Sequence, residues 1–209
     1  MKFHSKVLSS RQQKTLRQLS PILSPKGFYL GGGTAIALQL GHRRSFDLDW
    51  FTASRFDPLQ LAMELRQVGA RPIIRHVAEG TLDTVIGGVP VTFLQFSYPL
   101  LRPLRMWKDV QCKVCSLDDL ACMKLSAVAQ RGEKKDFVDL YALLDTHRSL
   151  RSMVNLYKKK FSLGDVAHML YALTYFDDAN HQPMPRMISR ASWTTVKKTL
   201  QSHVKELAK

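Results

Sequence analysis

The sequence predicts an α+β fold, in which strands and helices mix in the first half of the chain and helices alone make up the second. Two patterns lead to this prediction. Between residues 28 and 115, short apolar runs alternate with glycine-containing turns, whereas from Ser116 onwards apolar residues recur at helical spacing. A chain of 209 residues with 45% hydrophobic composition can bury one sizeable core with a smaller helical lobe packed on it. We therefore expect an α/β core over residues 1–115 and a helical lobe over residues 116–209.

Proline and glycine mark the elements of the first half. Pro25 follows a first helix, Thr34 starts a second helix that Gly41 closes as its C-terminal cap, and Pro58 precedes a third helix. Alternating apolar residues between glycine turns indicate strands. The expected helices span residues 11–24, 35–40 and 59–68; the expected strands lie at residues 28–30, 47–51 and 109–115, with several more within residues 72–98.

The second half begins with a capping signal. Ser116, with Asp119 three residues later, is typical of a helix start, and we expect this helix to run to Arg131. Gly132 separates it from the next helix. The further expected helices span residues 134–145, 150–160, 164–175 and 192–207, with the proline-containing loop at residues 183–185 before the last.

Composition excludes several classes of protein. No apolar run approaches the roughly 20 residues that cross a bilayer, and the amino terminus does not resemble a signal sequence, so we expect no membrane association and a cytoplasmic location. The three cysteines are too few for a disulfide framework or a four-cysteine zinc site. Cys112 and Cys115 form a CxxC within a predicted strand, where positions three apart face opposite sides. We expect reduced structural thiols.

The net charge of +14 is concentrated at the two ends of the chain. Residues 1–26 carry +6 and residues 146–209 carry +7, which leaves +1 for the region between them. Basic flanks around a neutral centre suit a polyanion such as RNA or DNA. Solvated helix surfaces explain the same pattern equally well. If the flanks do bind RNA, neutralising Lys158, Lys159 and Lys160 is expected to weaken that binding.

A glycine-rich turn and a pair of aspartates carry the most specific chemical signal. Gly32, Gly33 and Thr34 open a helix whose unpaired N–H groups and dipole favour a phosphate, and glycine lets the backbone approach it closely. Asp47 and Asp49 then alternate on a predicted strand, so their carboxylates project from one face. Mg²⁺ or Mn²⁺ is the natural cation for such a pair, together with substrate phosphates. Ser45, in the same stretch, is a further candidate for nucleotide binding.

Lys124 is the next candidate, because it lies in the middle of an apolar helical stripe. A lysine there is unfavourable unless an anion meets it, and the anion is either a triphosphate or the pair Asp47 and Asp49. Alternatively its stem packs on the stripe and its ammonium reaches water. If Lys124 meets a triphosphate, Lys124→Met is expected to preserve or raise stability in the absence of nucleotide.

Two further aspartates, Asp136 and Asp139, share a stripe on the following helix. Their simplest interpretation is a surface pair that bonds to Lys135 and Arg131. The role of Asp139 stays open at this point.

These motifs resemble those of the AbiEii/AbiGii toxin-type nucleotidyltransferases. The first motif of that family is similar to the run YLGGGTAIAL at residues 29–38, followed by GHRRS at 41–45 and DLDWF at 47–51. The family's lysine and aspartate motifs resemble SLDDL at residues 116–120, MKL at 123–125 and RGEKKDFVDLY at 131–141. Together the similar stretches span residues 28–145.

The resemblance implies a polymerase-β-like nucleotidyltransferase core, a mixed sheet with flanking helices, followed by a helical lobe that completes the active site. It also implies an NTP substrate, Mg²⁺, and often a toxin with a cognate antitoxin protein; family members include enzymes that add nucleotides to the 3′ ends of tRNA. Carried over by position, the resemblance implies that Gly33 and Thr34 hold phosphates and that Asp47 and Asp49 bind metal. It also implies that Lys124 contacts the triphosphate and that Asp136 completes the catalytic set.

One departure concerns a third acidic residue, which polymerase-β-like enzymes usually carry on a later strand. The expected strand at residues 89–96 has none. Either Asp136 substitutes for it, or this protein has one weak metal site.

The function expected from the sequence is transfer of a nucleoside monophosphate from an NTP to an acceptor hydroxyl of RNA, in particular a tRNA 3′ end, or of a protein. Kinase-like transfer of the γ-phosphate would use the same groups, and its nucleoside diphosphate product would distinguish it. A protein that binds nucleic acid without catalysis is the alternative from a different class.

Overall fold

The structure is a computed structural model that describes residues 3–207. Its strands are β1 (Tyr29–Leu30), β2 (Leu48–Thr52), β3 (Ile73–Ala78), β4 (Thr81–Ile86), β5 (Val89–Gln95), β6 (Arg105–Trp107) and β7 (Cys112–Val114). They form one seven-stranded sheet in the order β3-β4-β5-β2-β1-β7-β6. The sheet is mixed, because β2 runs parallel to β5 and antiparallel to β1, while β1 runs parallel to β7.

Helices precede, interrupt and follow the strands. The α-helices are α1 (Ser10–Leu23), α2 (Gly32–Leu40), α3 (Pro58–Gln67), α4 (Leu117–Gln130), α5 (Lys134–Thr146), α6 (Leu150–Phe161), α7 (Ala167–Ala172), α8 (Asp177–Asn180) and α9 (Trp193–Leu207), and the 3₁₀ helices are η1 (Ser5–Val7) and η2 (Lys108–Val110). Among the described residues, no helix has the length and apolar character that a membrane crossing requires.

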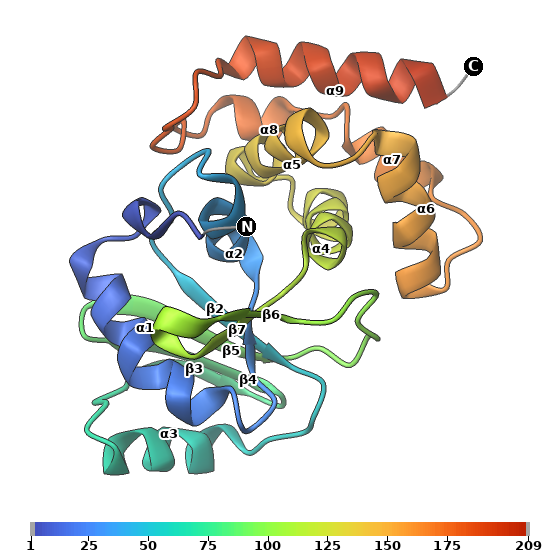
Figure 1. Ribbon diagram of the computed structural model, residues 1–209. Coiled ribbons are helices and arrows are strands. Elements are labelled where there is room, and N and C mark those ends of the chain that lie inside the picture. Colours follow the sequence, from blue (N-terminus) through green and yellow to red (C-terminus); the bar gives the residue numbers. More distant parts are fainter. Residues whose placement is uncertain (1–2, 208–209) are drawn as a thin grey trace.

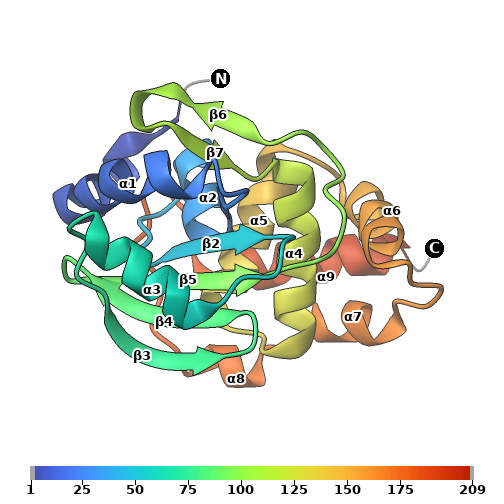
Figure 2. The same ribbon diagram turned by 90° about the horizontal axis from the view of Figure 1, so that it is seen from below.

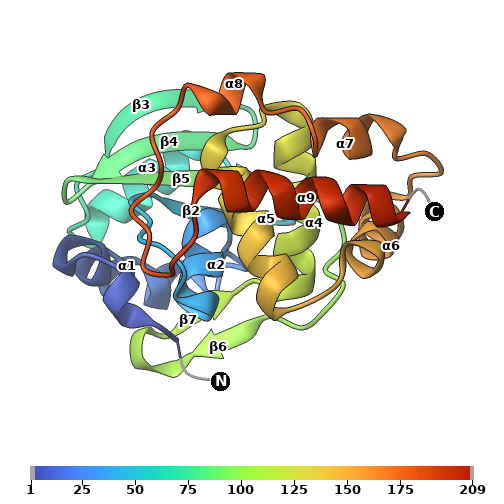
Figure 3. The ribbon, with the colours of Figure 1, turned by 90° about the horizontal axis from the view of Figure 1, so that it is seen from above.

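The helices form layers on the two faces of the sheet. α1 and α3 cover one face, and α2, α4 and α5 cover the other (Figures 1 and 2). α9 lies across the outer side of α4 and α5 (Figure 3). The segment that joins α8 to α9 runs alongside α2, where a β-bridge joins Arg43 to Met187. One buried apolar cluster extends from the sheet into these helices.

The sequence of β2 determines which side chains enter the core. Successive residues of a strand point to opposite faces. Leu48 and Trp50 are fully buried, whereas the half-buried Asp49 projects toward the backbone of Gly32 at the start of α2. The strand thereby brings a carboxylate to the sheet face that α2 covers.

The predicted α+β class is confirmed, and most helices begin and end within two residues of their predicted bounds. Gly41 is the predicted C-terminal cap of α2, in the left-handed conformation with φ 72°. The division at residue 115 into two domains stays a prediction, although all seven strands precede it.

Two predicted elements were wrong. The strand expected at residues 109–115 is interrupted, because η2 and a left-handed Gln111 reverse the chain, so that β6 and β7 pair as a hairpin. The helix expected at residues 164–175 is shorter. α7 starts only at Ala167, whose N–H donates to the Asp165 carboxylate, and α8 follows as a separate turn.

Candidate active site

A cleft of about 770 Å³ lies where the starts of α2 and β2 face α4 and the loop after α8. Asp47 and Asp49 stand on one wall, and Lys124 and Arg131 on another. Its other walls contain the apolar side chains of Phe51, Leu94, Phe96, Leu120 and Met123 and the loop at residues 182–186. The cleft therefore collects the predicted carboxylates, the predicted glycine turn and Lys124 in one place.

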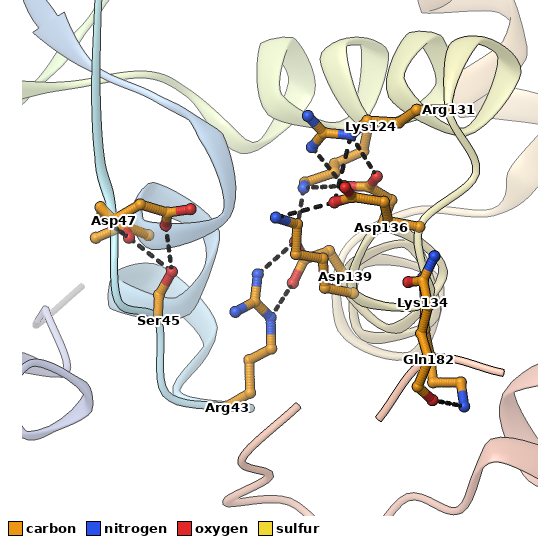
Figure 4. A network of polar contacts seen from close by, with 12 residues as sticks. Arg43, Ser45, Asp47, Lys124, Arg131, Lys134, Asp136, Asp139 and Gln182 are labelled. Atoms are coloured by element: carbon orange, nitrogen blue, oxygen red, sulfur yellow. Dashed lines mark hydrogen bonds and ion pairs between the residues drawn. The ribbon is translucent and has the colours of Figure 1, made fainter. Parts of the chain in front are cut away.

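Asp47 is held in position by the hydroxyls that precede it. The Thr34 hydroxyl donates to the Asp47 carbonyl oxygen at 2.5 Å and lies 2.7 Å from the Ser45 Oγ. The Ser45 hydroxyl in turn donates to the Asp47 carboxylate at 3.2 Å, as Figure 4 shows. Thr34 is fully buried and is not among the residues that line the cleft, so its hydroxyl orients the aspartate strand from behind.

Gly32 and Gly33 lie so close to charged side chains that a Cβ at either position would force the neighbouring side chain to shift. Gly32 has a φ of +61°, and a Cβ there would lie 2.1 Å from the Asp49 carboxylate. A Cβ on Gly33 would lie 2.3 Å from the guanidinium of Arg43. The glycine turn predicted to approach a phosphate thus also approaches Asp49.

The start of α2 has the features of an anion site. Its N-cap residue, Gly31, offers no side chain to bond the first N–H groups. These groups and the positive end of the helix dipole favour an anion. Gly32 and Gly33 line the cleft. A phosphate bound here would therefore be adjacent to Asp49.

Lys124 is buried in an ion-pair network with two aspartates of α5. Its ammonium lies 2.6 Å from the Asp136 carboxylate and 2.9 Å from that of Asp139. Arg43 approaches Asp139 from the opposite side with two hydrogen bonds of 2.6 and 2.8 Å (Figure 4). His42 also contacts Asp139, at 2.8 Å. The network joins α4, α5 and the segment after α2.

The predicted surface pair of Asp136 and Asp139 was wrong. Both side chains are fully buried, and although Asp136 does bond to Arg131, its main partner is Lys124. The helix turns this stripe inward because Lys124 and Arg43 neutralise its charge there. The anions that meet Lys124 are consequently Asp136 and Asp139, and not Asp47 and Asp49.

The network shifts the pKa of its members in opposite directions. Burial alone would lower the pKa of Lys124, but the Asp139 and Asp136 carboxylates raise it above its ordinary value. Burial alone would raise the pKa of Asp136 and Asp139, but Lys124, with Arg131 or Arg43, holds both below their ordinary values. The three side chains are therefore all charged at neutral pH.

Asp49 behaves differently, because within residues 3–207 it forms no ion pair with a basic side chain. Burial and the neighbouring Asp47 charge raise the pKa of Asp49 to about 7. Two neighbouring carboxylates that line a cleft are a suitable place for a divalent cation, which needs oxygen ligands. The donor set, with an anion site for substrate phosphates beside it, fits Mg²⁺ or Mn²⁺.

Asp136 is not brought together with the other two carboxylates. It stands behind Lys124 and does not line the cleft. Within residues 3–207 no group of three or more His, Cys, Asp or Glu side chains is arranged to hold a metal. β5 also carries no acidic residue, and Thr92 stands opposite Asp49. Glu133 also lines the cleft, but it pairs with Lys135 at 2.9 Å, so Asp47 and Asp49 are the carboxylate pair beside the glycine turn.

Sequence reasoning assigned no role to Arg43, or to the loop at residues 182–186. The sequence did contain a signal for Arg43. This arginine comes two residues after the helix cap Gly41, and a later helix carries Asp139, an acidic residue to which no role had been assigned. No local pattern identifies the loop, because it reaches the cleft through contacts with residues about 140 positions earlier. Arg44 N–H, for example, donates to the Arg186 carbonyl oxygen at 2.8 Å.

Sequence comparison gives a family match over the later part of the chain. Residues 80–206 match the family described as "Nucleotidyl transferase AbiEii toxin, Type IV TA system". An uncharacterized protein of Aquifex aeolicus is 32% identical over 202 residues, which cover 95% of this chain and 97% of that protein.

Solved structures show the same fold at low sequence identity. The nucleotidyltransferase toxin MenT4 of Mycobacterium tuberculosis superposes with a TM-score of 0.63 and 14% identity, over 94% of this chain and 83% of that one. A putative nucleotidyltransferase of H. pylori gives a TM-score of 0.52 and 14% identity, over 96% and 98% of the two chains.

The family match identifies the protein as a nucleotidyltransferase. Its mixed sheet with a helical C-terminal region is the fold that the similar solved structures share. The chain belongs to the AbiEii family of nucleotidyl transferase toxins.

Proposed function

We propose that the protein transfers a nucleoside monophosphate from an NTP to an acceptor hydroxyl in this cleft, with Asp47 and Asp49 holding Mg²⁺ or Mn²⁺. The observation that carries the proposal is the position of Asp49 against Gly32, because it places the carboxylate pair beside an uncapped helix start. A divalent cation there would neutralise phosphate charge and lower the pKa of the attacking hydroxyl.

The protein's own residues bind and orient the substrates. The N–H groups of Gly32 and Gly33 bind phosphate oxygens, and Ser45 and Thr34 hold Asp47 in place. The acceptor oxygen bonds to the α-phosphorus, and the bond from that phosphorus to the bridging oxygen breaks. Pyrophosphate leaves with the electron pair, and the hydroxyl proton passes to water.

Lys124 contributes positive charge at the cleft wall while Asp136 and Asp139 fix its position. Arg131 lines the same wall, is about half exposed, and adds a second cation near the triphosphate. Asp136 acts through Lys124 and is a positioning residue in this proposal.

The proposed acceptor is RNA, with the tRNA 3′ end as the first candidate and a protein hydroxyl as the second. The family description as a toxin of a TA system supports a cognate antitoxin partner. We place the protein in the cytoplasm, where NTP, RNA and antitoxin are found together.

The test is incubation with NTPs labelled on the α- or the γ-phosphate, Mg²⁺ and total RNA. The proposal predicts α-label in a macromolecule and γ-label in pyrophosphate. If γ-label enters the macromolecule and nucleoside diphosphate appears, the reaction is phosphoryl transfer. RNA binding without transfer of either label would indicate a non-catalytic binding protein.

A further inference from the structure

An exposed aromatic ring stands beside the carboxylate pair. Phe46 lies in the chain between Ser45 and Asp47, lines the cleft and is 54% exposed. Single exposed apolar side chains are common and need no special explanation. The position of Phe46 next to Asp47, and the partner that holds its ring, distinguish it from the others.

Arg186 holds the ring from the loop after α8. Its guanidinium carbon lies 5.3 Å from the centroid of the Phe46 ring, in a cation–π contact. The backbone fixes this arrangement, because the Arg186 carbonyl accepts from Arg44 N–H at 2.8 Å and the His42 carbonyl accepts from Ile188 N–H at 2.9 Å. Ring and guanidinium therefore belong to one built surface, although they come from distant parts of the sequence.

The cleft has a second apolar zone on the other side of the carboxylates. Phe51 lies two residues after Asp49 on β2 and pairs with Leu94 of β5, and both line the cleft. Phe51 is 8% exposed, in contrast to Phe46. The enclosed zone suits the base of the NTP, which leaves the exposed ring free for the other substrate.

The cations around Phe46 differ from the others in the cleft. Lys124, Arg43 and Arg131 all pair with carboxylates. Arg44 and Arg186 are exposed, and within residues 3–207 neither forms an ion pair. An aromatic face flanked by unpaired arginines matches the alternating bases and phosphates of a single strand. A peptide hydroxyl would require neither feature.

We propose that Phe46 and Arg186 form a stacking platform for the terminal base of a single-stranded nucleic-acid acceptor, and that Arg44 contacts its phosphate. This inference rests on the proposed function, because it assigns the second substrate of the same cleft. It makes Phe46 a determinant of acceptor binding, separate from the NTP zone.

The test compares Phe46→Ala and Phe46→Trp with the wild type. The kinetic assay measures the KM for a single-stranded RNA acceptor and the KM for NTP, and fluorescence anisotropy measures binding of a single-stranded RNA oligonucleotide without NTP. Because Phe46→Ala removes the surface on which one base stacks, this variant should raise the acceptor KM and the RNA Kd roughly 10-fold. The NTP KM should stay within about twofold, and Phe46→Trp should restore both acceptor values. Tyr171→Ala is the matched control, because Tyr171 is exposed on α7 and away from the cleft.

Several results would overturn the inference. An unchanged acceptor KM and RNA Kd in Phe46→Ala would show that Phe46 does not bind the acceptor. A rise in the NTP KM as large as the rise in the acceptor KM would place the ring in the nucleotide zone. Transfer by the wild type to a protein and not to RNA would also contradict it. A wild type that transfers nothing contradicts the proposed function, and the anisotropy measurement then still decides whether Phe46 binds single strands.

Discussion

Lys124 shows how far a single residue's role depends on partners that are distant in the sequence. Its position on an apolar stripe predicts a buried charge that needs an anion, and the structure supplies Asp136 and Asp139. The expectation that Lys124→Met preserves stability therefore has to be reversed. Removing the ammonium would leave two buried carboxylates with less compensation.

We now expect Lys124→Met to lower the free energy of unfolding by about 3–5 kcal/mol, measured by chemical denaturation without nucleotide. Adding Asp136→Asn should recover part of the loss, because it removes one of the two carboxylates that Lys124→Met leaves without their ammonium partner. Lys159→Met, at an exposed position of α6, is the control and should change little. Equal stability of Lys124→Met and the wild type would show that the network is not held by this lysine.

Gly32 gives a second prediction for a single residue. Gly32 has a φ of +61°, and a Cβ added there would lie 2.1 Å from the Asp49 carboxylate, so Gly32→Ala would strain the backbone and displace that carboxylate. We expect transfer activity to fall at least roughly 10-fold and stability to fall by about 1 kcal/mol or more. Gly164→Ala is the matched control, since no atom lies within 4 Å of its added Cβ. A fully active Gly32→Ala protein would argue against close approach at this turn.

Several residues of the candidate site could be predicted because their signals are local. The glycine turn, Asp47 and Asp49 lie within one stretch of sequence, and Lys124 interrupts a visible apolar stripe. Arg43, Phe46 and Arg186 acquire their roles from contacts made by the folded chain. The inward position of Asp139 was missed for the same reason: its partner is 96 residues away.

Among the elements, α4 is fixed at its start by a second ionic cluster. Asp118 accepts hydrogen bonds from Arg102 at 2.9 Å and from Arg148 at 2.5 and 3.0 Å, and contacts His147 at 2.8 Å. Burial alone would raise the pKa of Asp118, but these partners hold it well below its ordinary value. The cluster joins α4 to the loop before β6 and to the end of α5.

Asp118→Asn should therefore destabilise the protein in a pH-dependent way. A carboxylate with a lowered pKa stabilises the fold fully above its unfolded value of about 4, and this contribution is lost as the pH falls toward the folded value. We expect a loss of about 1–2 kcal/mol at pH 7, because both arginines are partly exposed to solvent. The difference in the free energy of unfolding between Asp118→Asn and the wild type should become smaller below about pH 4. A difference that is constant from pH 7 to pH 3 would contradict the ionic explanation.

Most elements were predictable because their start and stop signals are local. Ser116 caps α4 as its sequence indicates, with Asp119 N–H donating to its hydroxyl at 3.1 Å. The hairpin of β6 and β7 was missed because polar and apolar residues alternate over residues 109–114 as they do in a strand, although η2 ends at Val110. The two-residue β1 lies within the strand expected at residues 28–30 and pairs with β2 and β7.

At the scale of the whole molecule, the basic flanks do not contribute as a uniform surface. Lys160 is fully buried, where its ammonium lies 2.7 Å from the Asp119 carboxylate and donates to the Pro99 carbonyl oxygen. Neutralising it would disturb the fold and would not test RNA binding. The earlier expectation therefore applies to Lys159, which is exposed, and to Lys158, which is half-buried.

If the flanks attract RNA, its affinity should fall linearly with the logarithm of salt concentration, with a slope set by the number of phosphates contacted. The double variant Lys158→Ala/Lys159→Ala should reduce that slope by up to roughly 2 while the fold stays intact. Filter binding at several salt concentrations measures it. Affinity that does not depend on salt would identify the flanks as ordinary solvated surface.

The central claim is that Asp47 and Asp49 form the metal-holding centre of a nucleotidyltransferase. The most direct test measures Mg²⁺-dependent transfer by Asp47→Asn and Asp49→Asn, with the melting temperature of each and with the exposed Asp109→Asn as control. Asparagine keeps the shape of the side chain and removes the charge that holds the cation. We predict that transfer falls roughly 100-fold or more in both variants. The melting temperature should be equal or higher, because repulsion between like charges is relieved. Wild-type transfer rates in either folded variant would contradict the claim.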